Sequence, residues 1–130
     1  MSELRVSTGA DGPFTVLALH GDLDDTTAGS AEAHVLKAVV GGPAHLVLDL
    51  SGVGFLTSAG INLVAKTHFA VRTSRGSLRL VVPEGGGPER VLRFTGITEA
   101  VDTYPTLEQA LLPPVPEWRG LPEAEPESWE

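Results

Sequence analysis

A run of apolar residues, LVLDL at positions 46–50, is the feature that most constrains how this chain can fold. A strand with one face in water alternates apolar and polar residues, whereas four of these five residues are apolar. Such a run is typical of a strand that is covered on both faces, as in the middle of a parallel sheet. We therefore expect an α/β fold in which this segment is a central strand.

The residues that follow predict a parallel crossover. A glycine-containing loop leads from this strand to a helix expected over Ser58–Thr73, and Leu78–Val82 is a second short apolar run with β-favouring residues. Apolar residues recur at helical spacing within the helix, at Ile61, Val64, Ala65 and Val71. A strand, a helix and a strand in this order indicate a right-handed crossover between two parallel strands.

The amino-terminal part predicts a β-hairpin and a helix. Leu4–Ser7 and Phe14–His20 are expected to be strands, and the TGADG segment at positions 8–12 contains the glycines and aspartate that tight reversals favour. A helix is indicated by apolar residues at helical spacing, namely Ala28, Ala31, Val35 and Val39. The Gly41-Gly42-Pro43 segment should end it.

The rest of the domain predicts two shorter helices. One should begin at Pro88 and end at Gly96, a placement that suits both residues. The other should begin near Thr106, because Thr106 and Gln109 have the spacing of a capping box. The expected fold is a small mixed β-sheet with parallel crossovers, an opening β-hairpin and about four flanking helices.

Positions 113–130 differ in composition from the rest of the chain. They hold five of the ten prolines, and five glutamates against one arginine. Prolines at this density interrupt any helix, so we expect an acidic tail that is extended or disordered. The boundary is set near Leu112, which leaves a single domain over residues 1–112.

Composition excludes several functions. The net charge of −8 disfavours a nucleic-acid partner, because nucleic-acid binding depends on clustered Lys and Arg. Cysteine is absent, so disulfides and thiolate nucleophiles are excluded. The first residues lack the pattern of a signal peptide, and no apolar run approaches the roughly 20 residues that span a bilayer. We expect a cytoplasmic protein with no cofactor and no membrane partner.

Ser58 is the candidate functional residue, because it stands between a buried strand and a helix. That junction should place it at the carboxyl edge of the sheet, where α/β proteins bind ligands and where helix N-termini favour negative charge. The alternative is structural: Thr57 or Ser58 caps the helix, as short hydroxyl side chains commonly do. From the residues alone, both interpretations remain open.

The stretch from Leu46 to Val71 resembles the core motif of the STAS family, the anti-sigma factor antagonists. In that motif an apolar strand is followed by four positions: Asp, then Ser, then either Ser or Thr, and then Gly. Here these four positions are Thr57, Ser58, Ala59 and Gly60. Three further segments are similar in kind and order, namely GDLDDTTA (21–28), LRFTGI (92–97) and YPTLEQAL (104–111). The resemblance spans residues 4–112.

This resemblance implies a regulatory protein and no enzyme activity. In the family, a partner kinase of the ATPase type, which is itself the anti-sigma factor, phosphorylates the serine that corresponds to Ser58, and binding to that kinase frees a sigma factor. The resemblance places the following residues on or beside the kinase-binding face: Asp22, Asp24, Thr26, Thr57, Ser58, Ala59, Gly60, Ile61 and Asn62.

One position departs from the family pattern. Thr57 stands where the family has aspartate, and a threonine can cap a helix but supplies no carboxylate to the kinase or to the seryl hydroxyl. A STAS scaffold or sensor subunit that is never phosphorylated is therefore the alternative function.

Two other functions fit the residues less well. A serine hydrolase needs Gly-x-Ser-x-Gly, but Leu56 stands two residues before Ser58, and the four histidines are too scattered to indicate a catalytic base or a metal site. A nucleotide site is suggested by the glycines at 85–87, but no Walker lysine follows and Pro88 removes an amide donor. The adjacent acids at 24–25 are expected to cap a helix.

Overall fold

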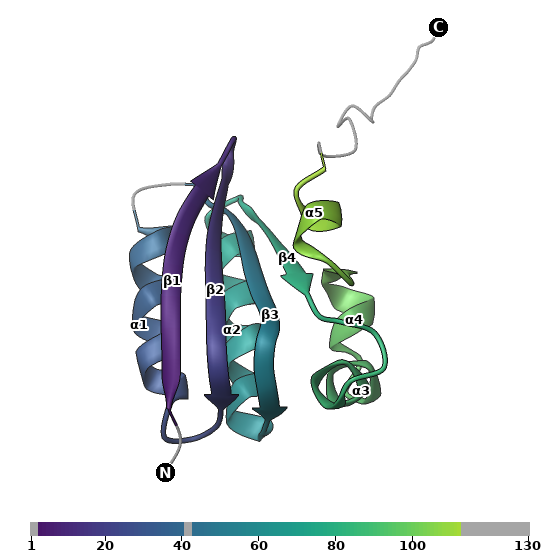
Figure 1. The fold of residues 1–130 in the computed structure, drawn as a ribbon. Helices are drawn as coiled ribbons and strands as arrows, with labels where there is room; N and C mark the ends of the chain where they lie inside the picture. Colours follow the sequence, from purple (N-terminus) through teal and green to yellow (C-terminus); the bar gives the residue numbers. More distant parts are fainter. Residues whose placement is uncertain (1–2, 41–42, 113–130) are drawn as a thin grey trace, which may run out of the picture.

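The computed structural model describes residues 3–40 and 43–112. Strands and helices follow one another along these residues as Figure 1 shows. Their bounds are β1 (Leu4–Asp11), β2 (Phe14–Leu23), α1 (Ala28–Val39), β3 (His45–Leu56), α2 (Ser58–Thr73), β4 (Ser77–Val81), α3 (Gly87–Phe94), α4 (Ile97–Ala100), β5 (Asp102–Tyr104) and α5 (Leu107–Ala110). The tail predicted for 113–130 lies outside the described residues.

All five strands belong to one sheet, in the order β1-β2-β3-β4-β5. β1 and β2 form the predicted hairpin and pair antiparallel, from Leu4 opposite Gly21 to Asp11 opposite Phe14. The pairs β2–β3, β3–β4 and β4–β5 are parallel. The mixed sheet with parallel crossovers through α1 and α2 is therefore confirmed.

The turn of the hairpin lies later in the chain than predicted. β1 continues to Asp11, and the turn consists of Gly12 and Pro13, with Gly12 at a φ of 56°. Glycine adopts this left-handed conformation without the steric cost that a Cβ atom brings. Most of the TGADG segment is strand because its residues pair with the start of β2.

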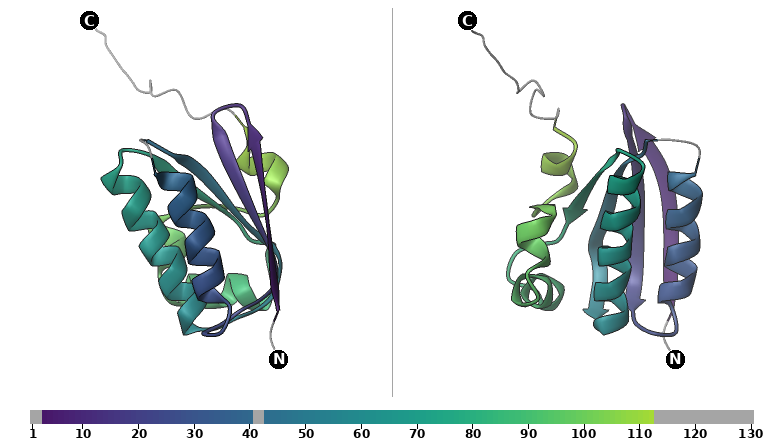
Figure 2. Two further views of the ribbon diagram at one scale, coloured as in Figure 1. Left: turned by 90° about the vertical axis from the view of Figure 1, so that its left-hand side faces the viewer. Right: turned by 180° about the vertical axis from the view of Figure 1, so that it is seen from behind.

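The central strand β3 is covered on both faces at positions 46–50, as predicted. Leu46, Leu48 and Leu50 are fully buried in the main core, which α1 and α2 close from one side of the sheet. These two helices lie next to each other on that face (Figure 2). Val47 faces the opposite side, in a smaller cluster with residues of β2, β4 and α5.

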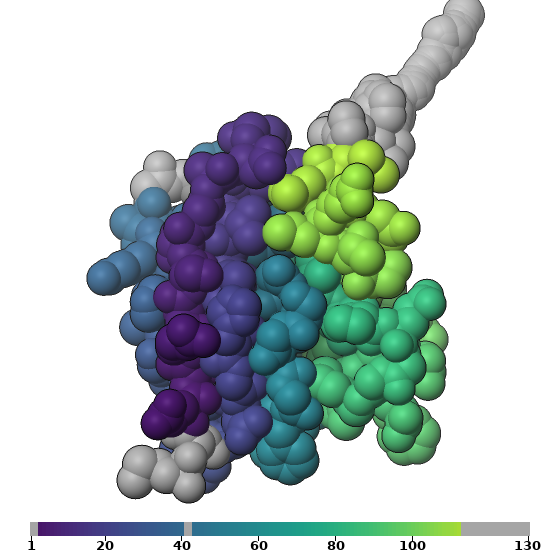
Figure 3. Space-filling view, in the orientation of Figure 1, coloured from purple at the N-terminus to yellow at the C-terminus, as the bar shows by residue number. Residues whose placement is uncertain are grey.

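The second face of the sheet is covered only in part. The smaller cluster contains Phe14, Val47, Val81 and Ala110, so α5 packs over part of β2, β3 and β4 on this face. Figure 3 shows that much of the surface of β1, β2 and β3 is open on this side. The fold thus has one complete layer of helices and one partial layer.

β3 is longer than predicted, because the expected glycine-containing loop is part of the strand. Val53 pairs with Gly21 of β2 after one shift in register, and Phe55 and Leu56 pair with Asp22 and Leu23 after a second shift. This pairing carries both strands to the same edge of the sheet. It also means that Ser58 follows the strand after a single residue, Thr57.

α2 has the predicted bounds, but its buried face differs from the predicted one. Ala65 is exposed, whereas Leu63 and Thr67 are buried. The buried positions therefore recur every three or four residues from Gly60 to Val71, as expected for a helix that packs on one side. Ala65 is small enough to sit at the boundary of that stripe without loss of core volume.

Between β4 and Leu112, the last described residue, the chain forms three short helices where two were predicted. Gly96, at a φ of 84°, separates α3 from α4, which has four residues. At α5 the predicted capping threonine is present, since the Gln109 N–H donates to Thr106 Oγ1 at 3.2 Å. α4 and the three-residue β5 are too short to show a hydrophobic period, which is why the sequence pattern did not indicate them.

Arg79 of β4 attaches α5 to the sheet. Its guanidinium carbon lies 4.7 Å from the centroid of the Phe14 ring and 5.7 Å from that of Tyr104. Its Nη1 donates to the carbonyl oxygens of Ala110 at 2.7 Å and of Leu112 at 3.0 Å. One side chain therefore holds the C-terminal helix over the second face.

We expect Arg79→Met to lower the free energy of unfolding by about 1–3 kcal/mol, because it removes both hydrogen bonds and the cation–π contacts but keeps the aliphatic stem. Urea unfolding measures the change. Arg72→Met, at an exposed position of α2, should change the free energy by less than about 0.5 kcal/mol. Equal destabilisation by the two substitutions would show that Arg79 does not anchor α5.

Candidate functional site

The ends of β2 and β3 and the beginnings of α1 and α2 meet at one edge of the sheet (Figure 1). The two strands are parallel and end at Leu23 and Leu56, which are partners in the sheet register. Immediately beyond them, the Thr57 N–H donates to the Leu23 carbonyl at 3.1 Å. Residues 22–26 and 57–62, which we call the carboxyl-edge surface, are thereby joined by a backbone hydrogen bond.

The β2–α1 loop is organised by the carboxylate of Asp24, which is 9% exposed. Its Oδ1 accepts from the Thr26 N–H at 2.9 Å, the Thr26 hydroxyl at 2.7 Å and the Thr27 N–H at 3.2 Å. The prediction that Asp24 and Asp25 cap the following helix is wrong, because Thr27 is the N-cap and the first turn of α1 has no acidic residue. Asp24 instead closes the turn that precedes the helix.

Ser58 is the first residue of α2, and it is exposed. Thr57 is the N-cap, but its side chain makes no capping hydrogen bond, and its hydroxyl lies 3.5 Å from the Leu23 carbonyl oxygen. The structural alternative was that Thr57 or Ser58 caps the helix: the Thr57 hydroxyl makes no such bond, and Ser58 lies inside the helix as its first residue. The Ser58 hydroxyl stands at the protein surface, where another protein can reach it.

Gly60 allows α2 to approach the end of β2 closely. A Cβ atom at this position would collide with the Leu56 side chain and would lie 3.0 Å from both Cγ and the carbonyl oxygen of Leu23. Gly60 is itself buried. Its lack of a side chain therefore contributes to the contact that holds Ser58 beside the β2–α1 loop.

The other residues expected on this surface differ in their exposure. Thr26 and Asn62 are exposed, Asp22, Ala59 and Ile61 are half-buried, and Ile61 also packs against the main core. Asp24 and Gly60 are buried: the Asp24 carboxylate bonds within the loop, and Gly60 packs against Leu23 and Leu56.

Phe55 belongs to the same edge and was missed by sequence reasoning. It is paired with Asp22 in the register of β2 and β3, and its side chain is 60% exposed. The only signal in the sequence is an aromatic residue three positions before Ser58, in a glycine-containing segment that predicts a loop. A large exposed apolar side chain at this end of the sheet adds contact area for a protein partner.

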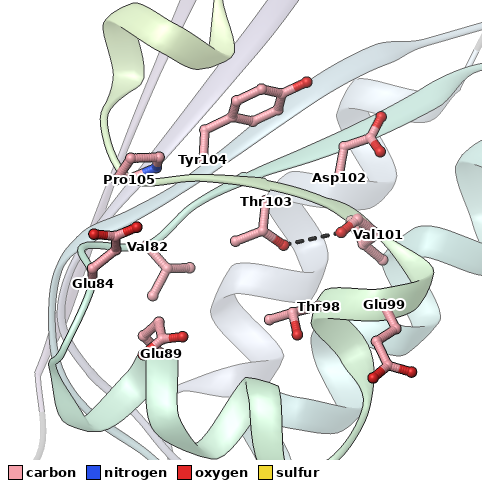
Figure 4. A pocket seen from close by; sticks show the side chains of 10 residues that line it. All are labelled: Val82, Glu84, Glu89, Thr98, Glu99, Val101, Asp102, Thr103, Tyr104 and Pro105. Atoms are coloured by element: carbon pink, nitrogen blue, oxygen red, sulfur yellow. Dashed lines mark hydrogen bonds between the residues drawn. The ribbon is translucent and has the colours of Figure 1, made fainter.

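A separate hollow of about 350 Å³ lies between β5, α4 and the connection from β4 to α3 (Figure 4). It adjoins the triple-glycine turn that suggested nucleotide binding. Four of its lining residues are acidic and none is basic, the acids being Glu84, Glu89, Glu99 and Asp102. Such a lining repels phosphate, so the hollow does not favour a nucleotide.

The described residues also bear on metals and membranes. Over residues 3–40 and 43–112, no group of three or more His, Asp or Glu residues could hold a metal ion. None of the helices in this part of the chain has the length and apolar composition needed to cross a bilayer.

We expect Gly60→Ala to lower the free energy of unfolding by about 1–3 kcal/mol, because the added methyl group must displace Leu56 or the backbone at Leu23. Gly29→Ala is the matched control, since Gly29 also lies in a helix but a Cβ there would meet nothing within 4 Å. That substitution should raise stability, by up to about 1 kcal/mol. Thermal or urea unfolding of both variants decides; an unchanged stability of Gly60→Ala would contradict the close approach.

The chain resembles known proteins over most of its length. A sequence model of the STAS domain matches residues 3–110. The anti-sigma-F factor antagonist RsfB of Mycobacterium tuberculosis is 31% identical over 109 residues, which cover 83% of this chain and 87% of that protein. The crystal structure of an anti-sigma factor antagonist from Mycobacterium paratuberculosis has a TM-score of 0.76 at 28% identity and covers 84% of this chain and 92% of that one.

A more distant structure shares the fold. The anti-sigma factor antagonist SpoIIAA in its unphosphorylated form has a TM-score of 0.64 at 18% identity, over 92% of this chain and 100% of that one. The same fold is found in the phosphorylated form of SpoIIAA from Bacillus, with a TM-score of 0.61 at 20% identity over 82% of this chain and 96% of that one. With the domain match covering nearly all described residues, the chain belongs to the STAS domain family.

Proposed function

We propose that this protein is an anti-sigma factor antagonist that binds an anti-sigma factor of the ATPase-type serine kinase class and is switched off by phosphorylation of Ser58. Binding would free the sigma factor that the kinase otherwise holds, in the cytoplasm where transcription takes place. The observation that carries the proposal is the exposed Ser58 at the first position of α2, beside the β2–α1 loop. Relatives named as antagonists support the same role.

The carboxyl-edge surface has features that suit a protein partner. Ser58 and Asn62 are exposed one helical turn apart, and Thr26 is exposed on the facing loop. Phe55, which is 60% exposed and paired with Asp22, would supply an apolar contact at the same end of the sheet. Specific protein interfaces usually combine apolar contacts with hydrogen-bonding residues.

Phosphorylation would add a charge that this fold tolerates. The γ-phosphoryl group of ATP would move to the Ser58 hydroxyl oxygen, with loss of the hydroxyl proton and release of ADP. The product carries a charge of about −1.5 to −2 at a helix start whose first turn contains no acidic residue. The free N–H groups of a helix start favour such a charge, so the domain should remain folded.

The partner would then lose its contact with Ser58. A surface shaped for a neutral hydroxyl must desolvate the phosphate, and a loss of about 4 kcal/mol corresponds to roughly thousandfold weaker binding. The switch therefore acts at the interface and leaves the fold of the antagonist intact.

A STAS scaffold or sensor subunit that is never phosphorylated is the second candidate. The observation that favours it is Thr57, which supplies no carboxylate and whose hydroxyl lies near the Leu23 carbonyl. Co-purification from the native cell separates the two functions. An ATPase-type kinase in the complex and phosphate on Ser58, both identified by mass spectrometry, support the antagonist. Stable partners with an unmodified Ser58 under all growth conditions support the scaffold.

We expect Ser58→Asp to weaken binding to the co-purified kinase by at least a hundredfold, because a carboxylate places a permanent charge in the interface. Ser58→Ala should bind about as tightly as the wild type, since it removes a hydroxyl but adds no charge. Isothermal titration calorimetry measures all three affinities.

Ser30→Asp is the control for added charge on this edge of the fold. Ser30 is an exposed serine in the first turn of α1, as Ser58 is in the first turn of α2. The control should lose less than about tenfold in affinity. Binding of Ser58→Asp that equals the wild type would refute the switch, and an equal loss for Ser30→Asp would show that only net charge matters.

A further inference from the structure

The peptide group between Leu23 and Asp24 connects the two halves of the carboxyl-edge surface. Its carbonyl oxygen accepts from the Thr57 N–H at 3.1 Å, at the start of α2. Its N–H donates to the Thr27 hydroxyl oxygen at 2.9 Å, at the start of α1. Because a trans peptide group is planar, the direction of its N–H also determines the direction of its carbonyl.

The Thr27 hydroxyl is well placed to control this peptide group. Thr27 is 6% exposed, and its hydroxyl donates to the Asp22 carbonyl oxygen at 2.8 Å. One hydroxyl therefore engages the peptide groups on both sides of Leu23. Thr27 is the N-cap of α1, yet its side chain makes no capping hydrogen bond. The Thr27 hydroxyl thus bonds to backbone groups of the β2–α1 loop and does not cap α1.

Two neighbouring side chains lie near the Leu23–Asp24 peptide group but orient it less directly than Thr27 does. Asp24 Oδ1 accepts from the N–H groups of Thr26 and Thr27, and it lies 3.3 Å from the Thr27 hydroxyl oxygen, farther than the Asp22 carbonyl oxygen at 2.8 Å. The Thr57 hydroxyl lies 3.5 Å from the Leu23 carbonyl oxygen, a distance too long to orient that carbonyl strongly.

We propose that Thr27 is a positioning residue for Ser58. Its buried hydroxyl orients the Leu23–Asp24 peptide group, whose carbonyl receives Thr57 and so sets where Ser58 stands relative to the β2–α1 loop. The orientation follows from contacts within this chain, and its consequence for phosphorylation rests on the function proposed above. Thr27 reaches Ser58 only through this backbone.

The direct test is Thr27→Val, which keeps the shape of the side chain and removes the hydroxyl. The Thr57 N–H should exchange with solvent at least about tenfold faster, because its acceptor is no longer held in place. Amide exchange measured by NMR on the full chain reports this without any partner. Thr27→Ser, which restores the hydroxyl, should return the exchange rate to within about threefold of the wild type.

Thr67→Val is the matched control. Thr67 is buried at 1% exposure, and its hydroxyl donates to the Leu63 carbonyl at 2.7 Å within α2, away from the helix start. The Thr67→Val variant therefore loses a buried threonine hydroxyl that does not contact the Leu23–Asp24 peptide group. Exchange at Thr57 should stay at the wild-type rate in this variant. If the Thr57 N–H exchanges as slowly in Thr27→Val as in the wild type, the inference is overturned. It is also overturned if this N–H exchanges as fast in the control Thr67→Val as in Thr27→Val.

A kinetic measurement tests the consequence for Ser58. With the kinase that co-purifies with the native protein, Thr27→Val should raise the KM for phosphorylation of Ser58 about tenfold and change kcat by less than about threefold, because docking must reorder the surface. Thr27→Ser should restore the KM. Faster exchange with an unchanged KM would overturn the link to Ser58. Absence of phosphorylation in the wild type itself would refute the proposed function, while the exchange experiment still decides the role of Thr27.

Discussion

The hydrogen bond from the Thr57 N–H to the Leu23 carbonyl is the contact on which the candidate site depends. It joins the end of β2 to the start of α2, and therefore brings together segments that are more than thirty residues apart in the chain. Gly60 permits the approach because it has no side chain to collide with Leu23. Ser58, one residue after Thr57, is exposed next to this hydrogen bond.

This arrangement separates the stability of the fold from the control of binding. The main core lies between the sheet and helices α1 and α2, where Leu46, Leu48 and Leu50 of β3 are fully buried. Ser58 contributes nothing to that core, so a phosphate can be added without disturbing it. A change in charge at the surface can then alter affinity for a partner by orders of magnitude while the domain keeps its structure.

The sequence predicted the features that depend on local patterns. The bounds of α2 and the burial of the LVLDL strand follow from periodicity, and the hairpin follows from short β-favouring runs around glycine. The extension of β3 to Leu56 could not be predicted in this way, because it depends on pairing with β2. For the same reason the sequence pattern does not place Phe55 in a strand. The role inferred for Thr27 could not be predicted either. Its hydroxyl bonds to backbone groups of Asp24 and Asp22, and such bonds do not depend on a recognisable sequence pattern.

The central claim is that a phosphate on Ser58 releases the partner and leaves the fold unchanged. The most direct measurement is size-exclusion chromatography of the purified complex with its kinase before and after addition of ATP, with mass spectrometric mapping of the phosphate in each peak. We predict that the antagonist leaves the complex as a folded, monophosphorylated protein modified at Ser58. Phosphorylated antagonist that still elutes with the kinase, or release with an unmodified Ser58, would contradict the account.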